Sequence, residues 1–133
     1  MEGYYSPHDI GYRELYGPGH WDLIHRHSAK ADSQEKKLYI MNMLDMESMS
    51  FGCKECRNDF YELWNRYKKK IDIYWNKCVK LEDRIIPCGM LLLTVDIHNE
   101  VNRKLGKSTI TYREAISKYL IEKDGDCDDI CSG

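Results

Sequence analysis

One segment, residues 87–106, constrains the fold of this chain more than any other. Pro87 suits a helix start and Gly106 a helix end, and residues between them recur at helical spacing. The resulting face contains Leu91, Thr94, Val95, His98, Val101, Asn102 and Leu105. It directs His98 and Asn102 toward the interior, where buried polar side chains need hydrogen-bond partners. A bound cofactor would supply such partners, and so would buried water molecules.

Two segments before this one also show helical patterns. One helix is predicted to begin near Pro18 and to have a single face made of Trp21, Ile24, His25 and Ser28. The next is capped by Asp32 or Ser33, and its apolar side comprises Leu38, Met41, Leu44 and Met49. Both patterns predict helices that pack against a common core.

A third helix is predicted to begin at the closely spaced pair Cys53 and Cys56. Its inward face repeats as Cys56, Phe60, Leu63, Tyr67 and Ile71, which leaves Cys53 at an exposed first turn. Residues 71–84 are ambiguous, because the helix can continue through Cys78 or end in a loop before Pro87. A short last helix, about 111–122, has Ile116, Tyr119 and Leu120 on its inner side.

Length and composition are those of one globular domain. The chain has 133 residues, of which 42% are hydrophobic and 32% charged. Its net charge of -2 argues against a general nucleic-acid binder, which would carry a basic excess. The longest apolar run, 90–95, is too short to span a bilayer, and residues 1–20 show no secretory signal. We expect an irregular arm at 1–17, a domain at 18–122 and an acidic tail at 123–133.

The six cysteines form three local pairs, which are Cys53/Cys56, Cys78/Cys88 and Cys127/Cys131. Cys53 and Cys56 have the spacing of a redox pair, and a helix N-terminus favours the reactive thiolate. They also suit half of a zinc site that Cys127 and Cys131 would complete. Spacing alone leaves both interpretations open, the second being a zinc-stabilised helical interaction module.

The segment from His98 to Lys107, HNEVNRKLGK, closely resembles the signature of the Erv/ALR family of FAD-dependent sulfhydryl oxidases. That family pairs a His-Asn-x-x-Asn-x-x-Leu-x-Lys segment with a Cys-x-x-Cys, which Cys53-Lys54-Glu55-Cys56 fits. A third element, Gly-x-x-x-Trp-x-x-(Leu/Ile)-His, fits Gly17, Trp21, Ile24 and His25. The departures are Gly52 and Ser108, where the family commonly has proline.

The resemblance implies an all-α fold, a four-helix bundle with a short fifth helix that binds FAD at one end. It assigns the cofactor pocket to Gly17, Trp21, His25, His98, Asn99, Val101, Asn102, Lys107 and Tyr119, with no metal. Lys107 would neutralise phosphate charge. Members are usually homodimers. The implied reaction oxidises the dithiols of protein substrates, or of a thioredoxin-like relay protein, and passes electrons through FAD to dioxygen to give hydrogen peroxide.

The resemblance also gives roles to the cysteine pairs. Cys53 would accept the incoming thiolate through a mixed disulfide, and Cys56 would lie next to the flavin. Cys127 and Cys131 would form a shuttle disulfide, and the remaining pair, Cys78 and Cys88, a structural one. The divergence from the family pattern and the missing targeting segment favour a viral or minimal member in host cytoplasm or virion. The mitochondrial intermembrane space is the alternative.

Overall fold

The computed structural model describes residues 18–50 and 54–122, and these residues are predominantly helical. The four long helices are α2 (Pro18–Ala29), α3 (Gln34–Ser50), α4 (Lys54–Lys68) and α6 (Gly89–Leu105). A short helix α5 (Ile71–Trp75) and a hairpin of β1 (Cys78–Leu81) and β2 (Arg84–Pro87) connect α4 to α6. Helix α7 (Tyr112–Ile116) continues into the π-helical segment η2 (Ser117–Glu122). The predicted all-α fold class is confirmed, apart from the small hairpin.

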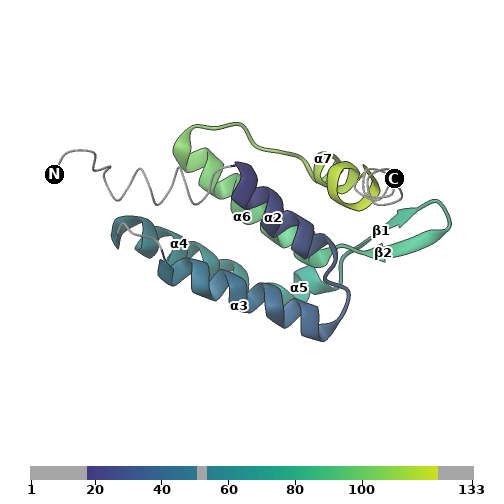
Figure 1. The fold of residues 1–133 in the computed structure, drawn as a ribbon, viewed down its shortest axis with the longest axis horizontal. Helices are drawn as coiled ribbons and strands as arrows, with labels where there is room; N and C mark the ends of the chain where they lie inside the picture. Colours follow the sequence, from purple (N-terminus) through teal and green to yellow (C-terminus); the bar gives the residue numbers. More distant parts are fainter. Residues whose placement is uncertain (1–17, 51–53, 123–133) are drawn as a thin grey trace, which may run out of the picture.

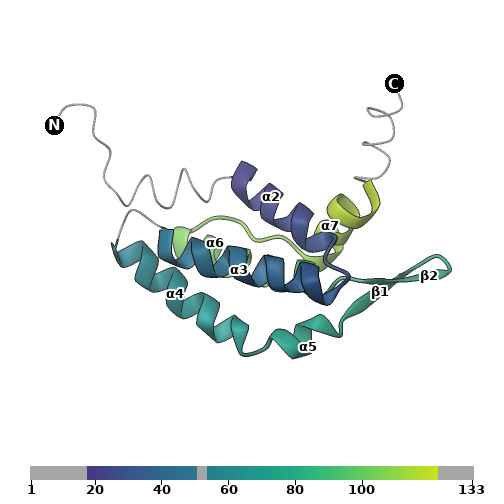
Figure 2. The same cartoon turned by 60° about the horizontal axis from the view of Figure 1, so that its bottom comes forward.

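Helix α6 is the centre of the bundle. It contacts α2, α4, α5 and α7, while α3 lies along α4 and also reaches α2. Figure 1 shows α2 beside α6 and α3 beside α4, and Figure 2 shows the hairpin projecting from the same end of the molecule as α5. Residues 90–95 of α6 are all buried, because the first half of this helix has neighbours on every side. The helix predicted at 87–106 is therefore the core element, as expected.

The inward faces of the first two helices differ in how well their sequence predicts them. On α2, the four predicted positions from Trp21 to Ser28 are all buried. On α3, the buried stripe is Ile40, Leu44 and Ser48, spaced four residues apart. Leu38 and Met49 are 55% and 67% exposed, so the prediction that they face the core is wrong. Apolar residues of α3 lie on all sides of the helix. The packing of α3 against α2 and α4 decides which of them are buried.

The ambiguous stretch 71–84 resolves as a short helix followed by a β-turn-β hairpin. The helical interpretation extended through Cys78, but α5 ends at Trp75 and Cys78 begins β1. Pro87 ends β2, so α6 starts two residues later than predicted, at Gly89. A Cβ atom at Gly89 would overlap the backbone carbonyl of Tyr74, so this start requires glycine.

The hairpin register separates Cys78 from Cys88. Cys78 pairs with Pro87, and the backbone amide of Cys88 donates to the carbonyl of Lys77 at 3.1 Å. Successive side chains of a strand point to opposite faces, so this register directs the two thiols apart. Cys78 is exposed, Cys88 is buried, and both are free thiols. The structural disulfide expected between them is not formed in the structure.

No helix among the described residues is long and apolar enough to cross a membrane. The predicted arm at 1–17 and tail at 123–133 lie outside these residues, as do Gly17, Cys53, Cys127 and Cys131.

Candidate functional site

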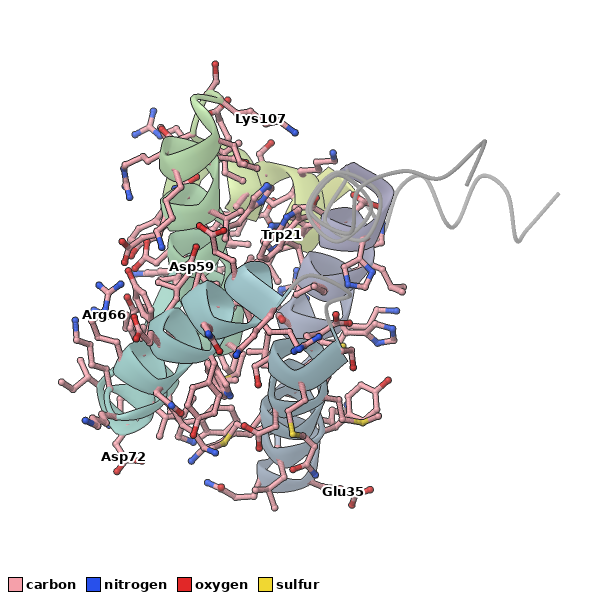
Figure 3. The ribbon with its side chains drawn as sticks, turned by 90° about the vertical axis from the view of Figure 1, so that its left-hand side faces the viewer. Trp21, Glu35, Asp59, Arg66, Asp72 and Lys107 are labelled. Carbon is pink, nitrogen blue, oxygen red and sulfur yellow. The ribbon has the colours of Figure 1, made fainter. Side chains whose placement is uncertain are left out.

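A pocket of about 300 Å³ lies between α2, α6, α7 and η2. Its lining comprises Trp21, Asp22, His25, His98, Ile110, Glu114, Ala115, Lys118 and Tyr119. Figure 3 shows Trp21 between α2 and α6, with Lys107 at the end of α6. Four residues that the sequence predicted for cofactor binding, Trp21, His25, His98 and Tyr119, therefore meet in one cavity.

Aromatic rings form the inner wall of this pocket. The rings of Trp21 and His98 are stacked, with centroids 4.2 Å apart and planes 6° from parallel. The ring centroid of His25 lies 5.1 Å from that of His98 and 5.3 Å from that of Tyr119. Three elements distant in sequence thus supply a continuous group of flat π-surfaces, which can stack on a planar aromatic ligand.

His25 supplies the polar partner that His98 requires. His25 Nε2 lies 2.9 Å from His98 Nδ1, and His25 Nδ1 lies 3.1 Å from Thr94 Oγ1. The sequence placed His25 and His98 on inward faces, but their contact joins residues 73 positions apart. The partner of His98 is therefore another histidine of the chain, and neither a cofactor nor a water molecule is needed for that bond.

Both imidazoles are neutral at pH 7. Burial lowers the pKa of His25 to about 3, and the nearby His98 adds to this effect. Burial also lowers the pKa of His98 to about 4, helped by the positive charge of Lys107. The two imidazoles of the aromatic inner wall therefore add no charge to the pocket.

Asn99 and Asn102 hold the connection between α6 and α7. Asn99 makes two hydrogen bonds to the backbone of Ile110, donating from Nδ2 at 2.8 Å and accepting at Oδ1 at 2.9 Å. Asn102 Nδ2 donates to the carbonyl of Ser108 at 2.9 Å. Because Ile110 lines the pocket, these two amides shape its wall through the backbone. Val101, also predicted for the cofactor, is a buried core residue.

Lys107 follows the left-handed Gly106, whose φ of 73° ends α6. The backbone amide of Lys107 donates to the carbonyl of Asn102 at 2.8 Å. Its side chain is exposed, yet its charge reaches His98, as the lowered pKa of that ring indicates. Lys107 is thus a cation whose charge acts on a residue of the pocket.

Asp22 and Lys118 also line the pocket, although the sequence pattern did not single them out. Asp22 accepts hydrogen bonds from Tyr119 Oη at 2.9 Å and Arg26 Nε at 2.7 Å, and Lys118 Nζ lies 3.6 Å away. Partial burial raises the pKa of Asp22, but the bonds from Arg26 and Tyr119 outweigh it, so the pKa lies below its ordinary value. The only local signal was the Asp22–Arg26 spacing of four residues.

The first turn of α7 also has a local signal. Thr111 and Glu114 form a reciprocal capping box, which fixes where α7 begins and so places Glu114 and Ala115 at the pocket. The Thr111-x-x-Glu114 motif can be recognised in the sequence, whereas the contact of α7 with the pocket cannot be predicted from it.

Cys56 lies in the first turn of α4, and Cys53, Cys127 and Cys131 lie outside the described residues. Within residues 18–50 and 54–122, no group of three or more histidine, cysteine or carboxylate side chains could hold a metal ion. The alternative zinc site would need Cys53, Cys127 and Cys131, which are outside that part of the chain.

Comparison with known proteins gives one match. The sequence model of the Erv1 / Alr family matches residues 18–121, which include every residue of the pocket. No curated protein and no solved structure matches the chain significantly. The match covers most of the chain and spans all four long helices. The chain therefore belongs to the Erv1 / Alr family, which is a family of sulfhydryl oxidases.

Proposed function

We propose that this protein is an FAD-linked thiol oxidase that converts protein dithiols to disulfides. The observation that carries the proposal is the pocket, in which Trp21 and His25 of one family motif contact His98 of the other. The family match covers Trp21, His25 and His98. In the overall reaction, two thiols and dioxygen give one disulfide and hydrogen peroxide.

The residues around the pocket fit FAD in their chemistry. Stacked Trp21 and His98 offer a flat apolar surface to an aromatic ring system, and the neutral imidazoles add no charge. Lys107 and Lys118 offer positive charge to phosphate groups outside the aromatic wall. When bound, FAD would supply an acceptor for the electron pair of a dithiol and a route from there to dioxygen, which side chains alone do not provide.

The dithiol chemistry falls to the pair Cys53 and Cys56. Cys56 lies in the first turn of α4, where the helix N-terminus stabilises a thiolate. In our proposal a substrate thiolate attacks Cys53, and the mixed disulfide is resolved by the second substrate thiol. That first attack breaks the Cys53–Cys56 disulfide and expels Cys56 as a thiolate, and resolution of the mixed disulfide frees Cys53. The Cys53–Cys56 disulfide re-forms when this dithiol gives its electron pair to the bound cofactor. Cys127 and Cys131 act before them as a shuttle between the substrate and this pair.

A homodimer is part of the proposal, and an exposed apolar stripe supports it. Tyr39, Met46 and Met49 on α3 are 55%, 65% and 67% exposed, and Leu23 on α2 is also exposed. The ring of His27 on α2 contacts Tyr39, so the stripe extends over both helices. A surface of this kind is typical of a protein interface.

Oxygen consumption with a dithiol such as dithiothreitol tests the function. Wild type consumes oxygen and forms peroxide, and Cys53→Ala and Cys56→Ala abolish both, while Cys78→Ala leaves them unchanged. Cys127→Ala retains activity on the small dithiol and loses it on a protein substrate. Stoichiometric zinc, with a fold lost on chelation and no flavin, would replace the proposal by the helical interaction module.

A further inference from the structure

A chain of hydrogen bonds runs from the backbone of α6 through two imidazoles to the pocket. Thr94 Oγ1 donates to the carbonyl of Leu91 at 3.0 Å, and the same oxygen lies 3.1 Å from His25 Nδ1. His25 Nε2 lies 2.9 Å from His98 Nδ1. Thr94 is fully buried and His25 nearly so, so the bond between Thr94 and His25 is shielded from water.

The first bond of this chain fixes the direction of the others. The Leu91 carbonyl can only accept, so the Thr94 proton points to it and the Thr94 oxygen must accept from His25 Nδ1. A neutral imidazole carries one proton, so His25 Nε2 is then an acceptor. It accepts from His98 Nδ1, which leaves His98 Nε2 without a proton.

The opposite direction is less favourable at the buried end. If Thr94 donated to His25, its oxygen would face the Leu91 carbonyl at 3.0 Å with no proton between the two oxygens. Threonine in a helix commonly donates to the carbonyl of the preceding turn, which needs no such repulsion. Because Thr94 is 0% exposed, water cannot relieve it.

We propose that Thr94 is a positioning residue that sets the tautomers of His25 and His98, so that His98 Nε2 presents a lone pair to the ligand. His98 lines the pocket, and Nε2 has no hydrogen bond to any described residue. The pocket therefore selects a ligand that places an N–H or O–H donor against this nitrogen. An aromatic imide or amine on a planar ring has that chemistry. The identity of the ligand rests on the proposed function, whereas the tautomers do not.

Long-range proton–nitrogen NMR spectra of the flavin-free full chain, labelled with ¹⁵N-histidine, test the tautomers directly. Protonated and bare ring nitrogens resonate far apart in such spectra. We expect His25 and His98 to carry their protons on Nδ1 at pH 7. A His98 ring protonated on Nε2 in the wild type overturns the proposal.

Two variants of Thr94 separate its hydroxyl from its volume. Thr94→Ser keeps the hydroxyl and retains both tautomers, whereas Thr94→Val is nearly isosteric and releases them to a mixture. In a titration followed by flavin fluorescence, Thr94→Val weakens FAD binding about tenfold, the equivalent of one hydrogen bond, and Thr94→Ser does not.

Equal tautomers and equal affinity in both variants contradict the role of Thr94. If Thr94→Val fails to fold by circular dichroism, the wild-type tautomers and Thr94→Ser still decide. If the wild type binds no FAD, the proposed function fails. The NMR spectra still decide the tautomers of His25 and His98, because they are recorded without flavin.

Discussion

At the scale of single residues, several buried or partly buried polar groups have hydrogen-bond partners far away in sequence. The indole N–H of the buried Trp64 on α4 donates to Asp45 of α3 at 2.6 Å, and Lys68 Nζ lies 3.1 Å from the same carboxylate. The hydroxyls of Tyr74 and Tyr112 both donate to Asp96 of α6. These contacts connect helices that the apolar core alone would leave free to slide.

We predict that Asp45→Ala lowers the free energy of unfolding by about 1–3 kcal/mol. The reason is that it leaves the buried N–H of Trp64 without its acceptor. Urea unfolding followed by tryptophan fluorescence measures this change. Asp72→Ala is the matched control, since the side chain of Asp72 is 91% exposed and its ion pair with Lys37 is 3.8 Å long. Equal effects of both substitutions would refute the role of Asp45.

The two pocket histidines predict a loss of stability on acidification. Their pKa values are lowered in the folded protein, to about 3 and about 4, so the unfolded chain binds more protons below pH 6.5. Stability is full above that pH and falls as the pH drops. Between pH 7 and pH 5 the loss is on the order of 2 kcal/mol for each imidazole.

Thermal unfolding of the flavin-free protein at pH 7 and pH 5 measures this loss. His98→Asn removes one titrating imidazole and reduces the difference between the two pH values. A stability that does not change over this range would show that the histidines are not held neutral by burial.

At the scale of elements, close backbone approach determines where α6 begins. Gly89 lies against the backbone of Tyr74 and Trp75, so any side chain there pushes α6 away from α5. Gly19 in α2 has open space around its Cα. A methyl group would therefore overlap backbone atoms at Gly89 and would find free space at Gly19.

Gly89→Ala should destabilise the fold by more than about 1–3 kcal/mol, the usual effect of overpacking, because the overlap involves backbone atoms. Gly19→Ala should leave stability unchanged or raise it by up to about 1 kcal/mol, since alanine favours helix. Calorimetric Tm values of both variants compare these effects. A tolerated Gly89→Ala would mean that α5 and α6 are not packed as described.

The sequence predicts the helices that have a strong periodic pattern. It does not predict the features that depend on which elements pack together. The face of α6 and the buried residues of α2 follow from spacing, and the His98–Asn102 motif indicates the site. The partners do not follow, because His25 reaches His98 only after α2 has packed on α6. Asn99 and Asn102 bind the backbone of the next connection, a contact that depends on the path of the chain after Gly106.

The hairpin was missed for another reason. Its strands have four residues each, and apolar runs this short do not distinguish strand from helix. Glu82 has a φ of 56° in the two-residue turn, a position where glycine or asparagine is usual. The turn therefore lacks the residues by which a hairpin is recognised in a sequence.

At the scale of the whole molecule, the exposed apolar stripe on α3 predicts self-association. Sedimentation of the wild type at micromolar concentration should give a dimer, and Met46→Glu should give a monomer, because the new charge would be buried in the interface. Glu62→Lys on the exposed side of α4 serves as the control and remains dimeric. A monomeric wild type would contradict the proposed homodimer.

The visible absorption spectrum of the purified full chain tests the central claim, that the pocket of Trp21, His25 and His98 holds FAD. We expect a yellow protein with the two flavin bands and one FAD per chain, released on denaturation. Trp21→Ala should lose most of the flavin, because the stacking surface is gone. A wild-type protein that remains colourless after incubation with excess FAD would show that this pocket does not bind FAD.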